Sequence, residues 1–166
     1  LDTAPAAEDV PVDVGAVVER VEHMLSPLAR AVEVSLELKL QPGCVVLATE
    51  DDLYQIAFNL MENAVKYNLP GGRVLVTLTA DGGRVVLRVE DTGVGIPKAD
   101  LPKIFDRFYR VDKARSRAAG GTGLGLSIVR DTVLQHGGAV TARRREPEGT
   151  CFEVSFAQWN GEEVGR

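Results

Sequence analysis

The chain has 166 residues, of which 45% are hydrophobic and 26% charged, enough for one soluble domain with its own hydrophobic core. Its net charge of −5 provides no overall basic field that would attract nucleic acid or an anionic membrane. No apolar run approaches the roughly 20 residues that a bilayer requires. Cys44 and Cys151 lack metal-ligand spacing, so we interpret both as small core residues and leave a disulfide between them open.

The N-terminal half is predicted to begin with a linker and to continue with helices and strands. Residues 1–11 are rich in alanine, proline and acidic residues, which is typical of a linker or a cut end. Strict alternation of apolar residues over 32–40 predicts a half-buried strand. In chain order, the predicted elements are a helix from Val14 that Pro27 ends or bends, strands at 32–40 and 44–48, and a long helix from the candidate caps Thr49 and Asp51 to about Tyr67.

The C-terminal half alternates predicted β-hairpins with helices. Its elements are a hairpin of 74–79 and 84–90, a short helix at 97–104, a helix at 124–135 that Gly137 or Gly138 ends, and a hairpin of 139–145 and 150–156. Residues 111–122 show no apolar periodicity, and we expect a mobile loop there. This order favours a two-layer α/β (α+β) sandwich over residues 12–157, with a mixed sheet covered by helices on one face and 158–166 as a tail.

The long helix carries polar residues at the edge of its apolar stripe. Asn59, Asn63 and Lys66 fall within roughly 60° of one another at 100° per residue. The amide oxygen of asparagine suits Mg²⁺, which takes few protein ligands besides phosphates and waters, and lysine brings positive charge for phosphate. The face therefore indicates a phosphate and magnesium site, and an ordinary polar flank of an amphipathic helix is the alternative.

Residues 91–96 have the sequence Asp-Thr-Gly-Val-Gly-Ile and follow a predicted strand. Alternation along that strand places Asp91 on its apolar face, where a carboxylate needs a hydrogen-bond partner. The exocyclic amine of adenine would satisfy it, and Gly93 and Gly95 would let the backbone pass close to a flat base. The alternative is an Asp-Gly turn that only caps the strand end.

Residues 121–126 have the sequence Gly-Thr-Gly-Leu-Gly-Leu and open a predicted helix. Alternate glycines expose backbone N–H groups, and the helix N-terminus adds partial positive charge, so the segment suits phosphate. It is not a Walker A motif, because Lys-Ser/Thr does not follow the glycines, and it is not a G-x-G-x-x-G fingerprint. A flexible glycine hinge is the alternative.

Residues 105–110 have the sequence Phe-Asp-Arg-Phe-Tyr-Arg and precede a basic segment with Lys113, Arg115 and Arg117. Aromatic and basic side chains there could clamp a nucleotide and neutralise phosphate charge. The alternative is an aromatic core patch before a solvated loop, and we expect Phe105 and Phe108 to be largely buried.

Together the segments occur in the order N-x-x-x-N-A-x-K-Y, D-x-G-x-G-I, F-D-R-F-Y-R and G-T-G-L-G-L. In this combination residues 12–156 resemble the ATP-binding catalytic domain of the histidine-kinase ATPase family, which has the Bergerat fold, and the segments look like its N, G1, F and G2 boxes. The resemblance implies a mixed sheet of about five strands with about three helices. It also implies ATP and Mg²⁺ as ligands, with Asn63 as the magnesium ligand and Asn59 beside it.

The resemblance further assigns roles to individual residues. Those implied to be catalytic are Asn59, Glu62, Asn63, Lys66 and Arg110. Those implied to contact ATP are Asn59, Asn63, Lys66, Tyr67, Asp91, Gly93, Gly95, Ile96, Phe108, Tyr109, Arg110, Gly121, Thr122, Gly123, Leu124, Gly125 and Leu126. Residues 111–120 would form a lid over the nucleotide, and Glu62 either polarises the site or is simply solvated.

The family transfers the γ-phosphoryl group of ATP to a histidine on a separate dimerisation helix, from which it passes to an aspartate of a response regulator. The resemblance thus implies a protein-histidine kinase whose partners are that helical domain and, indirectly, a response regulator, with no role for nucleic acid. Neither His23 nor His136 lies in a segment like the family's phosphoacceptor, so we expect the acceptor outside this chain. We expect the isolated domain to be monomeric, and cytoplasmic in a membrane-anchored full-length protein.

Two other functions stay open from the sequence. One is a non-catalytic, nucleotide-dependent interaction module, or pseudokinase, against which the intact N, G1 and G2 boxes argue. The other is an ATPase or serine kinase of the same fold. Such relatives carry glutamate four residues before the magnesium asparagine, and Asn59 occupies that position here, which argues against this alternative.

Overall fold

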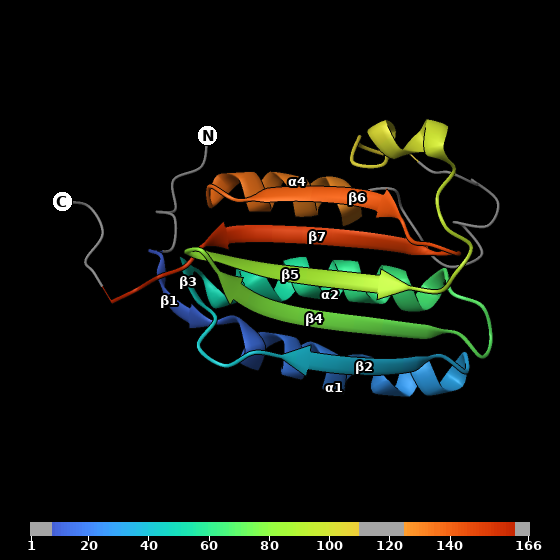
Figure 1. The fold of residues 1–166 in the computed structure, drawn as a ribbon, viewed down its shortest axis with the longest axis horizontal. Helices are drawn as coiled ribbons and strands as arrows, with labels where there is room; N and C mark the ends of the chain where they lie inside the picture. The colour runs from blue at the N-terminus through green and yellow to red at the C-terminus, as the bar shows by residue number, and fades with distance from the viewer. Residues whose placement is uncertain (1–7, 110–124, 162–166) are drawn as a thin grey trace.

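Segments with alternating apolar residues form a five-stranded sheet in the computed structural model, which describes residues 8–109 and 125–161 (Figure 1). Across the sheet the strands are β2 (Ser35–Leu40), β4 (Arg73–Asp81), β5 (Arg84–Asp91), β7 (Thr150–Ala157) and β6 (Ala139–Arg144). Strands β2 and β4 are parallel, and the other neighbours are antiparallel. The predicted mixed sheet and both predicted hairpins are therefore confirmed.

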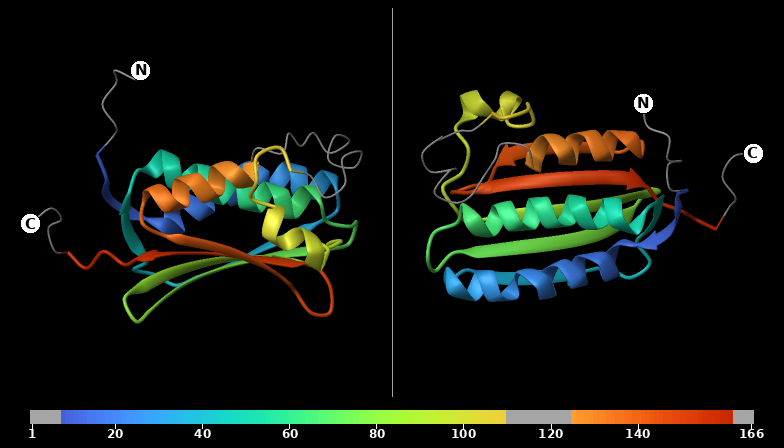
Figure 2. Two further views of the ribbon diagram at one scale, coloured as in Figure 1. Left: turned by 90° about the horizontal axis from the view of Figure 1, so that it is seen from above. Right: turned by 180° about the vertical axis from the view of Figure 1, so that it is seen from behind.

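The α-helices of the described residues all cover the same face of this sheet, as Figure 2 shows. They are α1 (Val14–Ala31), α2 (Glu50–Lys66) and α4 (Gly125–Gln135), with α2 packed between the other two. Their apolar stripes and the inward side chains of the strands form one core, which confirms the predicted two-layer sandwich. None of the described helices is long and apolar enough to cross a bilayer.

A second, smaller sheet lies where the described chain begins. Strand β1 (Val10–Asp13) pairs antiparallel with β3 (Val45–Ala48). The sequence pattern did not predict β1, because the strand is only four residues long and contains Pro11, which an edge strand tolerates. On the other side of β3, the Trp159 N–H donates to the Val45 carbonyl at 2.8 Å. Strand β1 and Trp159, near the two ends of the described chain, are therefore both hydrogen-bonded to β3.

Helix α1 runs to Ala31, and β2 begins later than the sequence pattern predicted. Pro27 lies inside α1 and does not end it. The helix instead ends where Glu33 adopts a left-handed φ of 61° and the Val34 N–H donates to the Ala29 carbonyl at 2.9 Å. Because this turn uses the residues expected to open the strand, β2 starts only at Ser35.

Both cysteines are buried and free, as predicted from their spacing, so the disulfide left open by the sequence does not form. Cys44 is 0% exposed and Cys151 is 1% exposed. Burial raises the pKa of both thiols, which keeps them protonated and favours a packing role.

His136 follows α4 and joins three parts of the fold. Its side chain is only 3% exposed, and its Nε2 donates to the Asp52 Oδ2 of α2 at 2.7 Å. Its Nδ1 lies 3.4 Å from the Asp9 Oδ2 that precedes β1, and makes no hydrogen bond within the described residues. The imidazole therefore links the N-terminal segment, the start of α2 and the end of α4.

Replacing Asp52 by alanine should destabilise the domain more than replacing Glu50. Asp52→Ala leaves a buried His136 nitrogen unpaired, which costs about 1–3 kcal/mol of unfolding free energy. Glu50→Ala only breaks an ion pair with Arg20 whose side chains are 56% and 59% exposed, so it should cost less than about 1 kcal/mol. Both carboxylates lie in the first turn of α2, so both changes lose a similar helix-dipole contribution. Urea unfolding measures the difference, and equal losses would contradict the link.

Candidate functional site

Several segments that are distant in sequence meet at one end of the sandwich. They are the C-terminal end of α2, the loop 92–97 after β5, the start of α4, and the turn between β6 and β7, all at the right of Figure 1. The small sheet of β1 and β3 lies at the opposite end. The predicted N, G1 and G2 segments are therefore brought together as far as the structure describes them.

The polar face of α2 reaches this end because of where the helix starts and stops. Thr49 caps the helix, since its Oγ1 accepts the Asp52 N–H at 3.1 Å, whereas Asp51 lies inside the first turn and is not the cap. The helix ends at Lys66, and the Tyr67 N–H donates to the Asn63 carbonyl at 3.1 Å. The predicted site residues consequently occupy its last two turns.

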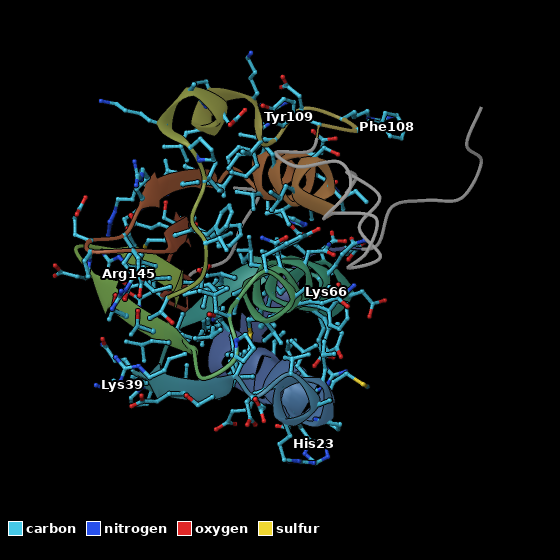
Figure 3. All side chains as sticks on the ribbon, turned by 90° about the vertical axis from the view of Figure 1, so that its right-hand side faces the viewer. His23, Lys39, Lys66, Phe108, Tyr109 and Arg145 are labelled. Atoms are coloured by element: carbon cyan, nitrogen blue, oxygen red, sulfur yellow. The ribbon has the colours of Figure 1, made fainter. Side chains whose placement is uncertain are left out.

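Asn59, Asn63 and Lys66 are all half-buried, as expected for a face at the edge of the core. Asn59 faces the start of α4, because a Cβ added to Gly125 would lie 3.6 Å from the Asn59 Oδ1. Lys66 Nζ lies 3.6 Å from Glu62 Oε2, and each side chain is 28% exposed. In the end-on view of Figure 3, Lys66 stands at the end of α2, where its charge can meet an anion.

Asp91 is the buried carboxylate that strand alternation predicted. It is 7% exposed, and its Oδ1 accepts the Gly93 N–H at 2.8 Å. Burial raises the pKa of Asp91 to about 6, against the lowering effect of backbone hydrogen bonds from Gly93 and Thr150 and of the positive charge of Arg145. At neutral pH the group is thus an ionised acceptor that has lost most of its water.

Glycines let backbone segments pack closely around Asp91. A Cβ added to Gly93 would lie 2.6 Å from the Tyr67 carbonyl oxygen, and Gly95 has a φ of +77°. Gly149, in the turn between β6 and β7, has a φ of +102°, and a Cβ there would lie 1.8 Å from the Asp91 carbonyl oxygen. Gly149 and Thr150 were not predicted as site residues, because nothing in the local sequence shows that they pack against Asp91.

The segment 105–109 is only partly buried. Phe105 is 9% exposed and lies edge-on to Phe152 of β7, with ring centroids 6.2 Å apart. The prediction that Phe108 is largely buried is wrong: it is 64% exposed and points away from the body of the molecule (Figure 3). Its left-handed φ of 63° after the 3-10 helix η1 (Lys98–Lys103) turns the side chain outward. Tyr109 is half-buried and donates to the Asp100 carboxylate.

The other predicted site residues divide into those inside and those outside the described chain. Ile96 and Leu126 are half-buried and pack against the core. Arg110, the predicted loop 111–122, and Gly121, Thr122, Gly123 and Leu124 lie outside the described residues.

The donors of the site fit a metal that arrives with phosphate. No group of three or more His, Cys, Asp or Glu side chains within the described residues could hold a metal ion by itself. The amide oxygens of Asn59 and Asn63 are neutral hard donors, and Mg²⁺ accepts few such protein ligands if phosphates and waters complete its shell. Asn63 could therefore ligate Mg²⁺ only together with a bound phosphate.

Comparisons with known proteins place the same residues in one family. Residues 48–159 match the family of histidine kinase-, DNA gyrase B-, and HSP90-like ATPases. The chain is 40% identical over 130 residues to the sensor histidine kinase RppB of Synechocystis sp.. The matched region covers 78% of this chain and 29% of RppB. The mycobacterial sensor histidine kinase MprB has a similar structure, with a TM-score of 0.77 and 32% identity over 90% of this chain and 97% of that chain. Full-length ShkA has a TM-score of 0.79 and 33% identity over 96% of this chain and 33% of its own.

Asp91 should make the stability of the ligand-free domain depend on pH. Because its folded pKa of about 6 exceeds the ordinary 3.8, the folded state binds more protons between these values. The stabilisation from the neutral carboxyl is therefore present below about pH 4 and lost as pH rises through 6. From about pH 5 to about pH 7.5, wild type should lose roughly 1–2 kcal/mol relative to Asp91→Asn. Chemical unfolding of both proteins at the two pH values measures this difference, and parallel curves would contradict the raised pKa.

Gly149→Ala should damage the site, whereas Gly43→Ala should not. Both glycines have positive φ, +102° and +81°, so both substitutions carry similar backbone strain of about 1 kcal/mol. Only the Cβ at residue 149 collides with backbone, and it would displace Asp91, whereas nothing lies within 4 Å of the Cβ at residue 43. We expect Gly149→Ala to lower the unfolding free energy by about 2 kcal/mol more than Gly43→Ala. Similar losses would show that the turn can move away from Asp91.

Proposed function

Because this chain belongs to the family of histidine kinase-, DNA gyrase B-, and HSP90-like ATPases, we propose that it acts as the catalytic and ATP-binding domain of a two-component sensor histidine kinase. In this role it binds ATP with Mg²⁺ and transfers the γ-phosphoryl group to a histidine on a separate dimerisation helix. The observation that carries the proposal is the buried, ionised Asp91 in a glycine-lined loop at the end of α2. Full-length ShkA, which is similar in structure, has been solved in complex with AMPPNP.

Asp91 supports the recognition of adenine. Its carboxylate can accept a hydrogen bond from the exocyclic amine of adenine, whereas guanine presents a carbonyl oxygen at that position and would be repelled. Gly93 and Gly95 have no side chains, so their backbone can lie against the base. The burial of Asp91 strengthens the discrimination, because a buried charge left without its donor is costly.

The end of α2 and the start of α4 support the binding of the phosphates. Lys66 brings positive charge, and the N-terminal end of α4 at Gly125 adds the partial positive charge of the helix dipole. Asn63, with Asn59 beside it, would hold Mg²⁺, which neutralises phosphate charge when it is bound. Phosphoryl transfer depends mainly on positioning and charge neutralisation, which these residues can supply. The resemblance to the family adds further residues that would contact ATP, namely Tyr67, Tyr109, Arg110 and the glycines of 121–124.

The acceptor histidine is assigned to another segment of the full-length protein. His23 is exposed on α1, on the side of the molecule away from η1 (Figure 3), and His136 is buried in its bond to Asp52. The chain spans only 29% of RppB, and a protein of that length would have room for dimerisation helices and a membrane anchor. The dimerisation domain and a response regulator are then its partners, and this domain faces the cytoplasm.

Nucleotide binding should require Asp91 and, when magnesium is present, Asn63. Asp91→Asn should weaken ATP binding by roughly 10- to 100-fold, since it replaces a charged acceptor. Asn63→Ala should reduce affinity only when Mg²⁺ is added, and Gln55→Ala, exposed on the same helix, serves as the control. Calorimetric titration with ATP and GTP, with and without Mg²⁺, measures these effects. An unchanged affinity for Asp91→Asn would remove the adenine assignment.

The kinase activity itself is tested by joining this domain to its native upstream segment and supplying ATP labelled on the γ-phosphate. We expect a label that is stable to alkali and lost in acid, as a phosphohistidine is, and that disappears with Asn63→Ala but not with Gln55→Ala. If ATP binds without dependence on Mg²⁺ and no label appears, the domain is a nucleotide-dependent interaction module.

A further inference from the structure

Asn68 lies outside every sequence motif, yet its side chain organises the loop between α2 and β4. Its Nδ2 donates to the Arg73 carbonyl at 3.0 Å, and its Oδ1 accepts the Leu69 N–H at 2.8 Å. A Cβ added to Gly72 would lie 2.1 Å from this Oδ1, so only glycine leaves room for the amide. The amide nitrogen and the amide oxygen of Asn68 are thus both hydrogen-bonded, and they connect the start of the loop to the first residue of β4.

The Arg73 peptide that Asn68 holds is also bonded to the loop that carries Asp91. The Arg73 N–H donates to the Thr92 Oγ1 at 2.9 Å, and the Thr92 N–H donates to the Arg73 carbonyl at 3.1 Å. The Arg73 carbonyl therefore receives donors from two residues, Asn68 and Thr92, and Thr92 donates to it with its hydroxyl at 3.4 Å as well as with its N–H. One of these residues lies at the end of α2, and the other is next to Asp91.

The two loops also touch directly, without free space between them. A Cβ added to Gly93 would lie 2.6 Å from the Tyr67 carbonyl oxygen and 3.0 Å from the Asn68 Cα. The Gly93 N–H in turn donates to the Asp91 Oδ1 at 2.8 Å and so orients the carboxylate. A shift of Asn68 would therefore be transmitted to the group assigned to adenine.

We propose that Asn68 is a positioning residue for the base: it fixes the end of α2 against the Asp91 loop through the Arg73 carbonyl, and so sets the place of the adenine acceptor. This inference rests on the proposed binding of ATP. It predicts an effect on the adenine side of the site that is separate from the magnesium and phosphate side, because Asn59 and Asn63 lie in earlier turns of α2. Geometry set by such a contact matters strongly, since small displacements weaken recognition.

Gln41 provides a matched control at the other end of β4. Its Oε1 accepts the Ala80 N–H at 3.1 Å, which, like the bond from Asn68 to Arg73, is a solvent-exposed hydrogen bond between a side chain and the backbone of β4. Gln41→Ala should therefore cost about as much stability as Asn68→Ala but leave nucleotide binding unchanged. Comparing the nucleotide affinities of Gln41→Ala and Asn68→Ala therefore distinguishes a general loss of stability from the displacement of the Asp91 carboxylate.

The test measures adenosine and ATP affinities of the whole chain for wild type, Asn68→Ala and Gln41→Ala, with and without Mg²⁺. We expect Asn68→Ala to weaken adenosine and ATP about equally, by roughly tenfold. The ratio of ATP affinities with and without Mg²⁺ should not change. Asn68→Asp keeps the acceptor for Leu69 but lacks the donor to Arg73, so it should lose affinity similarly and serves as the second variant if Asn68→Ala does not fold.

The inference is overturned if Asn68→Ala, or Asn68→Asp in its place, binds adenosine as wild type does. It is overturned equally if only the Mg²⁺-dependent part of ATP affinity falls. A wild-type chain that binds no ATP would instead remove the proposed function. A double variant with Thr92→Val adds a further test: because both residues bond the Arg73 peptide, the losses should be less than additive, and full additivity would contradict the shared path.

Discussion

The buried carboxylate of Asp91 is the constraint on which the candidate site of this domain depends. Its ionised form is disfavoured where it lies, and burial raises its pKa to about 6. The surrounding chain compensates with backbone donors from Gly93, in the loop after β5, and Thr150, the first residue of β7. An apo domain that carries this cost is suited to a ligand that offers the missing donor. Stability is thus exchanged for recognition at this position.

Helix α2 connects that carboxylate with the rest of the fold. One of its faces supplies the centre of the core between α1 and α4, and the adjoining face presents Asn59, Asn63 and Lys66. The end of the same helix touches the Asp91 loop at Gly93. Because these features share one rigid element, the base and phosphate sides of the proposed site would keep a constant separation, which precise positioning of a phosphoryl group requires.

The opposite end of the sandwich has a different task. There the β1–β3 sheet, the Trp159 contact and the buried His136 with Asp52 and Asp9 gather the segments near both ends of the described chain. These described segments lie at the end of the sandwich opposite the candidate site. His136 has a structural role at this end, because its imidazole is buried between the elements that it joins.

Sequence periodicity by itself determined the sandwich, the place of Asp91 on the apolar face of β5, and the polar face of α2, because spacing along a regular element dictates side-chain direction. Local pattern failed where tertiary contacts decide. Gly149 meets Asp91 only after two hairpins have formed, and the four-residue β1 exists only because β3 is beside it. Phe108 is exposed because its backbone adopts a left-handed conformation that no hydrophobic pattern encodes. The sequence therefore proposed the chemical groups of the site, and the tertiary structure decided which loops hold them in place, since those contacts join residues far apart in the chain.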